Sequence, residues 1–151
     1  MDKLSIEYAV EKAGWAQARI TNGDREAAIT VSYLHDSLLE LAQLALSLKK
    51  GASEAKVLFM DEPGEHQFIV STDGAEAKYE VRWYNDWESW GFRNQNEFHV
   101  VLKGATTVQR IVQQVTQVLW RIHEDLGPEK YKELWVEHEF PEQEFKELAN
   151  A

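Results

Sequence analysis

Residues 54–84 decide the fold, and they read EAKVLFMDEPGEHQFIVSTDGAEAKYEVRWY. Apolar residues recur at every second position in three runs of this stretch, which is the period of a strand with one buried face. The runs are separated by Asp61-Glu62-Pro63-Gly64 and Thr72-Asp73-Gly74, in which proline and glycine favour turns. Because strands joined by such short turns pair antiparallel, the stretch predicts a β-meander.

Further strands are expected on both sides of the meander. Downstream, residues 98–102 place alternate apolar side chains on one face. Upstream, residues 15–21 and 27–33 flank Asn22-Gly23-Asp24, which favours a hairpin because asparagine and glycine tolerate positive φ. Residues 4–10 also alternate, and this favours a strand, although several of these residues would also suit a short helix. The sequence therefore predicts a mostly antiparallel sheet.

The first of two long helices is predicted directly after the hairpin. Between Leu34 and Lys50, leucine and alanine residues form a broad apolar stripe at helical spacing. Either Ser32 or Asp36 is expected to cap the start of the helix, and Gly51 is expected to stop it. The breadth of the stripe indicates a helix that is covered on more than one side.

The second long helix is expected to begin with a threonine cap at 106–107 and to carry an apolar stripe from Val108 to Leu126. Two short helices follow, one over 129–135 and one that begins at Pro141. Together the elements predict a single α+β domain over residues 1–151. It has a mostly antiparallel β-sheet of about five to seven strands, two long helices packed on one face and short C-terminal helices.

An aromatic run interrupts the strand pattern at residues 82–93, which read RWYNDWESWGFR. Alternation places Trp83 in the core and Tyr84 on the other side of the sheet. Trp87 and Trp90 are three positions apart, and they either cap the end of the sheet or present an interaction surface. Tryptophan, tyrosine and arginine are frequent anchors of interfaces. The predicted partner- or ligand-binding residues are therefore Tyr84, Asp86, Trp87, Glu88, Trp90 and Arg93.

The composition excludes several classes of protein. The chain has no cysteine, which removes disulfides, zinc thiolate sites and cysteine nucleophiles and fits a reducing cytoplasm. The net charge of −10 opposes nucleic-acid binding and favours fast encounter with a basic protein, although it also serves solubility alone. The longest apolar stretch, Leu38 to Leu48, is too short and too polar to span a membrane. We therefore predict a cytoplasmic protein that binds neither nucleic acid nor membrane.

The sequence contains no motif that indicates catalysis or a cofactor. It has no glycine-rich nucleotide loop, no nucleophile elbow and no His-Glu-x-x-His. The acids around His138 and those of the 61–65 turn are more typical of solvated turns than of metal sites. Asp86 and Glu88 are two positions apart, whereas paired glycosidase acids come from separate elements. We predict no catalytic residue, no metal site and no cofactor.

The order of segments resembles that of small bacterial α+β proteins of unknown function. This resemblance is carried by Trp15, by SYLHDSLLELAQLALSLKKG at 32–51, by the DEPGE turn at 61–65, and by the helix containing Tyr131 and Trp135. In size and charge the chain is also similar to the immunity proteins of bacterial toxin systems. That similarity implies a basic nuclease toxin as the partner.

Three functions follow from these observations. The leading hypothesis is a non-enzymatic, acidic protein that binds a protein partner, with an immunity or accessory factor as one form of it. The first alternative is a small-molecule-binding protein or enzyme with an aromatic-lined pocket near residues 83–92, between the sheet and the helices. The second is a self-associating structural protein in which the helix at 34–50 forms the dimer seam.

Overall fold

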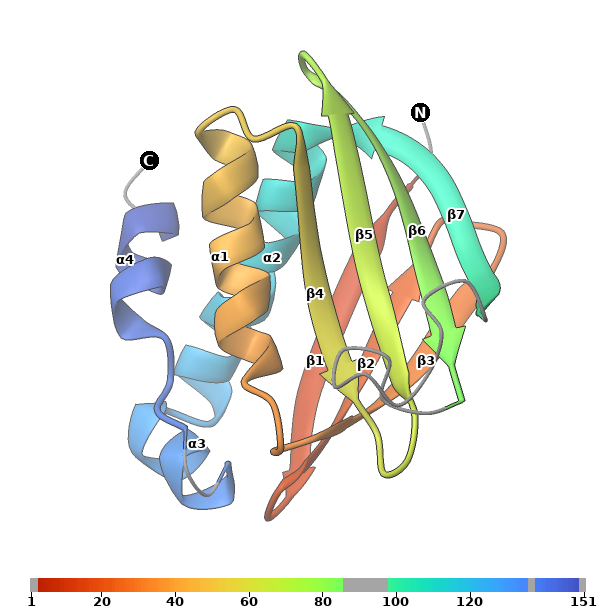
Figure 1. Ribbon diagram of the computed structural model, residues 1–151. Coiled ribbons are helices and arrows are strands. Elements are labelled where there is room, and N and C mark those ends of the chain that lie inside the picture. The colour runs from red at the N-terminus through yellow and green to blue at the C-terminus, as the bar shows by residue number, and fades with distance from the viewer. Residues whose placement is uncertain (1–2, 86–97, 136–137, 150–151) are drawn as a thin grey trace.

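The computed structural model describes residues 3–85, 98–135 and 138–149. In this part of the chain it has seven strands and four helices. Figure 1 shows the four helices together on one side of the molecule and two antiparallel sheets on the other, one sheet behind the other. The layers enclose one hydrophobic cluster, to which both sheets and all four helices contribute side chains.

The three-stranded sheet is formed by the N-terminal part of the chain. It consists of β1 (Ser5–Lys12), β2 (Trp15–Thr21) and β3 (Glu26–Ser32), in that order and all antiparallel. The predicted hairpin between β2 and β3 is confirmed: the side-chain oxygen of Asn22 accepts hydrogen bonds from the backbone N–H groups of Asp24 and Arg25, at 2.9 and 2.8 Å. The strand prediction for residues 4–10 is confirmed as well.

The four-stranded sheet contains the predicted meander. It consists of β4 (Glu54–Met60), β5 (Glu65–Asp73), β6 (Glu76–Tyr84) and β7 (His99–Thr107), again in chain order and all antiparallel. Gly64, in the turn between β4 and β5, has a φ of 95°, a conformation that glycine adopts without steric cost. One face of the sheet packs into the core, and the other is turned to the viewer in Figure 1.

The helices are α1 (Ser37–Lys49), α2 (Val108–Asp125), α3 (Pro128–Leu134) and α4 (Glu142–Ala149). Asp36 is the N-terminal cap of α1, where its side chain accepts from the N–H of Leu39, and Gly51 follows the helix with a φ of 96°. As its broad stripe indicated, α1 is covered on several sides, because it contacts β4, α2 and α4.

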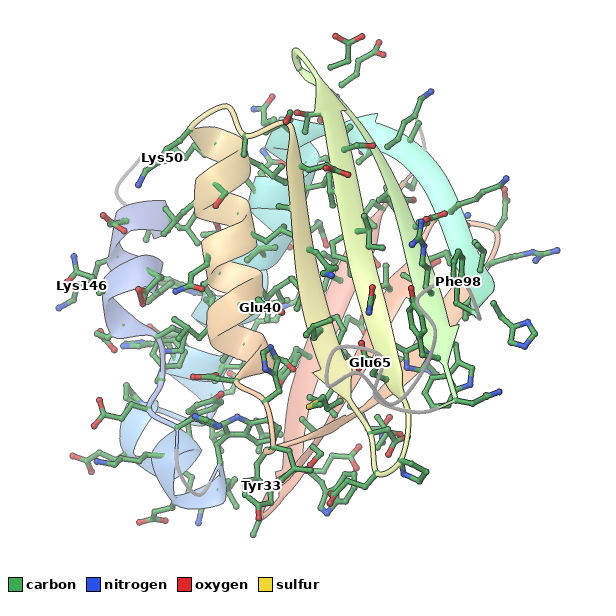
Figure 2. All side chains as sticks on the ribbon, in the orientation of Figure 1. Tyr33, Glu40, Lys50, Glu65, Phe98 and Lys146 are labelled. Carbon is green, nitrogen blue, oxygen red and sulfur yellow. The ribbon has the colours of Figure 1, made fainter. Side chains whose placement is uncertain are left out.

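The prediction of one sheet with two long helices on one face is wrong. The strands form two separate sheets, and among the described helices only α2 is long, with 18 residues against 13 in α1. The reason lies at the free edge of β4. There the backbone N–H of Leu58 donates to the Glu40 carboxylate, and the carbonyl of Leu58 accepts from the Ser37 hydroxyl. Figure 2 shows Glu40 on the side of α1 that faces β4. Since α1 satisfies this edge, β3 does not extend the sheet there.

No helix in the described ranges is long and apolar enough to cross a membrane. The single domain over residues 1–151 stays a prediction.

Candidate functional site

Of the six predicted site residues, only Tyr84 can be placed. Asp86, Trp87, Glu88, Trp90 and Arg93 lie outside the described residues. Tyr84 pairs with Glu65 of β5, on the face of the sheet that points away from the core, as alternation predicted. It is nevertheless only 2% exposed, and its ring lies 5.5 Å from that of Phe98 between centroids. A side chain this buried does not present a contact surface by itself.

Polar side chains lie near Tyr84 on the outer face of the four-stranded sheet. Glu65 is fully buried and accepts a hydrogen bond from the Gln67 amide at 2.7 Å. The guanidinium of Arg82 lies 4.2 Å above the Phe98 ring and is also paired with the Glu80 carboxylate. Figure 2 shows Glu65 and Phe98 near the same end of this sheet. Among the described residues, Tyr84 therefore packs against Phe98 on the outer face of the sheet, and the predicted site stays a prediction.

Trp83 differs from the core residue that alternation predicted. It points to the core side of β6, opposite His66, but it is half-buried and lies outside the hydrophobic cluster. Its indole N–H donates to the Asn85 side chain at 2.7 Å. At this end β6 extends beyond the hydrophobic cluster. Trp83 therefore faces the core side of the sheet without being fully buried.

An exposed aromatic side chain on α2 was missed by the sequence reasoning. Trp120 is 54% exposed, and among the described residues only Val100, at 45%, is a comparably exposed large apolar residue. The Trp120 ring lies 5.9 Å from that of Phe145 on α4. A signal was present: on a helical projection Trp120 falls on the polar face of the helix with Gln113 and Gln117, well away from the apolar stripe.

Two acidic side chains lie close to His123, which shares the Phe145 ring with Trp120. His123, one turn after Trp120, packs against Phe145 with ring centroids 5.2 Å apart. Its nitrogens lie 3.7 Å from the Glu124 carboxylate and 3.6 Å from that of Glu142. We refer to Trp120, His123, Glu124, Glu142 and Phe145 as the Trp120 patch. It combines an exposed ring face with two carboxylates, an arrangement that suits a cationic side chain.

A second group of polar side chains is buried where β1, the start of α1 and α3 meet. Burial raises the pKa of Tyr8 and of Tyr131, and the negative charge of Asp36 raises both further. Burial also raises the pKa of Asp36, against the opposing effects of its hydrogen bond from Leu39 and of nearby His138.

The imidazole of His138 connects the segment before α4 to the start of α1. It lies 2.9 Å from the carbonyl oxygen of Tyr33 and 3.6 Å from the Asp36 carboxylate. His138 was predicted to be a solvated turn residue, and these contacts instead give it a structural role. Among the described residues no group of three or more histidines and acids is arranged to hold a metal ion.

No protein-family model matches this sequence, and no curated protein matches it. The fold is similar to that of one chain in the CdiA-CT/CdiI toxin and immunity complex from Enterobacter cloacae. The TM-score is 0.50 at 8% sequence identity, and the likeness covers 77% of this chain and 98% of that chain. At so low an identity the likeness concerns the fold.

Proposed function

We propose that this protein acts by binding another protein and that the Trp120 patch is its contact surface. The observation that carries the proposal is the 54% exposure of Trp120, on a chain whose largest fully buried side chains include Trp135, Tyr84 and Tyr131. Leaving an indole in water forgoes the free energy of burying it, and tryptophan is the residue most enriched among interface anchors. A partner that covers Trp120 would recover that free energy.

The charge around the patch favours a basic partner. Glu124 and Glu142 flank the aromatic rings, and α4 carries three acidic residues against the single cation Lys146. Figure 2 shows Lys146 extending outward from α4, on the side away from the sheets. An arginine or lysine of the partner, placed over the indole, would gain a cation–π contact and a carboxylate. The net charge of −10 would accelerate the encounter.

An immunity or accessory factor is the specific form of this function that we favour. Its support is the acidic composition together with the fold likeness to a chain of a toxin and immunity complex. On this proposal the partner is a basic toxin whose activity the protein blocks by binding it, and the protein itself catalyses no reaction. The residues Asp86, Trp87, Glu88, Trp90 and Arg93 remain a proposed second contact region.

The surface predicted for self-association, the apolar stripe of α1, is not exposed in the fold. The apolar stripe of α1 is already buried within the chain, and its buried members are Leu38, Leu41, Ala42, Leu44, Ala45 and Leu48. A dimer seam on this helix would therefore require the fold to open.

The test begins with capture from a lysate of the source cells, followed by calorimetry on the purified partner. Trp120→Ala should weaken binding by about 30-fold or more, corresponding to about 2 kcal/mol for an interface anchor. Val100→Ala is the matched control, because Val100 is similarly exposed on a different element; it should bind within about twofold of the wild type. If Trp120→Ala binds normally and a Trp87→Ala/Trp90→Ala variant binds more weakly, the contact surface is the region predicted from the sequence and not the Trp120 patch.

The immunity form needs a separate experiment. The captured partner is expressed in cells alone, with this protein, and with its Trp120→Ala variant. If the partner is a toxin, it slows growth alone, the wild-type protein restores growth and the variant restores it incompletely. If the partner alone leaves growth normal, it is not a toxin. That result would contradict the immunity role but not the proposal that the protein binds a partner.

A further inference from the structure

A hollow of about 640 Å³ lies on the outer face of the four-stranded sheet, away from the Trp120 patch. Its lining comes from all four strands of the sheet. Ile69 supplies apolar surface at its floor, and Glu80 and Lys103 lie beside it on the next two strands. The polar and charged residues of the lining include Glu54, Ser71, Lys78, Glu80, Arg82 and Lys103.

The strand register explains why these side chains share one face. Ile69 pairs with Glu80, and Glu80 pairs with Lys103, so the three form a row across β5, β6 and β7. Lys78 lies two residues before Glu80 and therefore on the same face, one row away. On the other side of Ile69, the row continues to Lys56 of β4. Three lysines thus share one face of the sheet with Ile69, Lys56 on the neighbouring strand on one side and Lys78 and Lys103 on the other.

The charges of this face are incompletely compensated within the chain. The Glu80 carboxylate is already paired with Arg82 through two guanidinium nitrogens. Within the described ranges, Lys56, Lys78 and Lys103 are exposed and have no salt bridge, and Glu54 is the remaining acid of the lining. A chain with ten more acids than bases therefore presents a local excess of lysine around an apolar floor.

We infer that this lysine-lined hollow is a second docking site, which takes an acidic segment of a protein partner. The segment's apolar side chain packs on Ile69, and its carboxylates reach Lys78 and Lys103. The Cα atoms of these lysines are one strand and two residues apart, which amounts to about 8 Å from the spacings of a sheet. In an extended peptide, residues i and i+2 are about 6.7 Å apart on one side, so long carboxylate side chains there match the two ammonium groups.

The experiment uses the full chain and three fluorescein-labelled peptides of equal length, with the cores Glu-Ser-Glu-Ser-Leu, Gln-Ser-Gln-Ser-Leu and Lys-Ser-Lys-Ser-Leu. In each extended core the leucine lies on the same side as the two variable residues. Binding is followed by fluorescence anisotropy, and the contact is mapped by shifts of backbone amide signals in NMR. The acidic peptide should bind at least about tenfold more tightly than the other two, with the largest shifts at Ile69, Lys78 and Lys103. Equal binding of the neutral peptide, or shifts confined to another face, would overturn the inference.

Charge-reversal variants separate this site from the general charge of the protein. Lys78→Glu/Lys103→Glu should lose the tenfold preference, whereas Lys49→Glu/Lys50→Glu should keep it. Both double variants change the net charge equally at exposed positions, and Lys49 and Lys50 lie at the end of α1. Equal losses in the two variants would overturn the site, as would tighter binding of a ten-nucleotide oligothymidine to the same residues. Trp120→Ala should bind the acidic peptide normally, so failure of this inference and failure of the proposed function are distinguishable.

Discussion

The imidazole of His66 packs against the indole of Trp83, with their ring centroids 4.7 Å apart. Burial at this position lowers the pKa of His66 from 6.5 to about 4. The folded protein therefore keeps His66 neutral down to about pH 4, whereas the unfolded chain protonates it near pH 6.5. Between these values the unfolded state binds more protons, so the contribution of His66 to stability is present above pH 6.5 and is lost as the pH falls toward 4.

This relationship predicts a specific pH dependence. Between pH 7 and pH 5, protonation of His66 in the unfolded chain should cost about 2 kcal/mol of unfolding free energy. Urea denaturation at the two pH values, followed by tryptophan fluorescence, measures this loss in the wild type and in His66→Gln. The carboxylates are common to both proteins, so the variant should lose about 2 kcal/mol less over this range. Equal losses would show that His66 is not held neutral by burial.

The close approach of Gly64 to Trp83 makes a second prediction. A Cβ atom at Gly64 would come within 2.8 Å of Trp83 Cζ2 and 3.0 Å of the Tyr84 carbonyl oxygen, and the residue has a φ of 95°. We expect Gly64→Ala to cost about 2–4 kcal/mol, from the positive φ and from the contact with backbone. The control is Gly51→Ala, because Gly51 has a φ of 96° and nothing within 4 Å of its Cβ position. Gly51→Ala should cost about 1 kcal/mol of unfolding free energy. If the two substitutions cost the same, the Trp83 side chain must move aside without an energetic penalty.

The cap at Asp36 is expected to stabilise the start of α1. Its carboxylate accepts from the N–H of Leu39 at 3.3 Å and lies 3.6 Å from His138. Asp36→Ala should cost about 1–2 kcal/mol, and Asp36→Asn clearly less, because asparagine also caps helices. Thermal unfolding of both variants measures the difference. If asparagine is as damaging as alanine, the ion pair with His138 matters more than the cap.

The contact between Glu40 and the edge of β4 predicts a local effect. Glu40→Ala would leave the Leu58 N–H without its carboxylate acceptor, at a cost of about 1–3 kcal/mol. Glu40→Gln retains an acceptor and should cost less. Hydrogen exchange at the Leu58 amide is the sharpest measurement, because it should accelerate in the alanine variant alone. An unchanged rate would mean that another group protects this edge.

Substitutions of the two tryptophans Trp120 and Trp135 should reduce stability to very different extents. Trp135 is fully buried, and Trp135→Ala should cost about 3–5 kcal/mol of unfolding free energy. Trp120 is 54% exposed, and Trp120→Ala should cost less than about 1 kcal/mol. Urea denaturation of both variants checks this. A large cost at Trp120 would indicate a structural role in packing α2 against α4 and would weaken the proposed interface.

Much of the local structure was predictable from the sequence. The cap at Asp36, the stop at Gly51, the hairpin at Asn22-Gly23 and the turn before Gly64 all depend on neighbouring residues only. The short helix after Pro141 was predictable in the same way, and its apolar residues Phe145 and Leu148 are buried. Such features depend on local hydrogen bonds and on the backbone preferences of single residues. Both can be inferred from the residue types at neighbouring positions.

The candidate site was less predictable than the secondary structure. Alternation correctly placed Tyr84 on the outer side of the sheet, but its burial depends on contacts such as that with Phe98, from a different part of the sequence. The exposure of Trp120 could have been predicted from its place on the polar face of α2, whereas its contact with Phe145 of α4 could not. Periodicity gives the direction of a side chain, whereas its exposure depends on what packs over it.

The sequence by itself determined the strands, the helices and their order, because each element depends on the pattern of residues that are close together in the sequence. The tertiary structure alone decided that the strands divide into two sheets, since Ser37 and Glu40 satisfy the backbone of Leu58 from a helix. It also decided that Tyr84 is buried on the outer face of its sheet and where lysines gather on an acidic chain. The physical reason is the same in each case: edge hydrogen bonding, burial and local charge depend on residues that are distant in the sequence and adjacent in space.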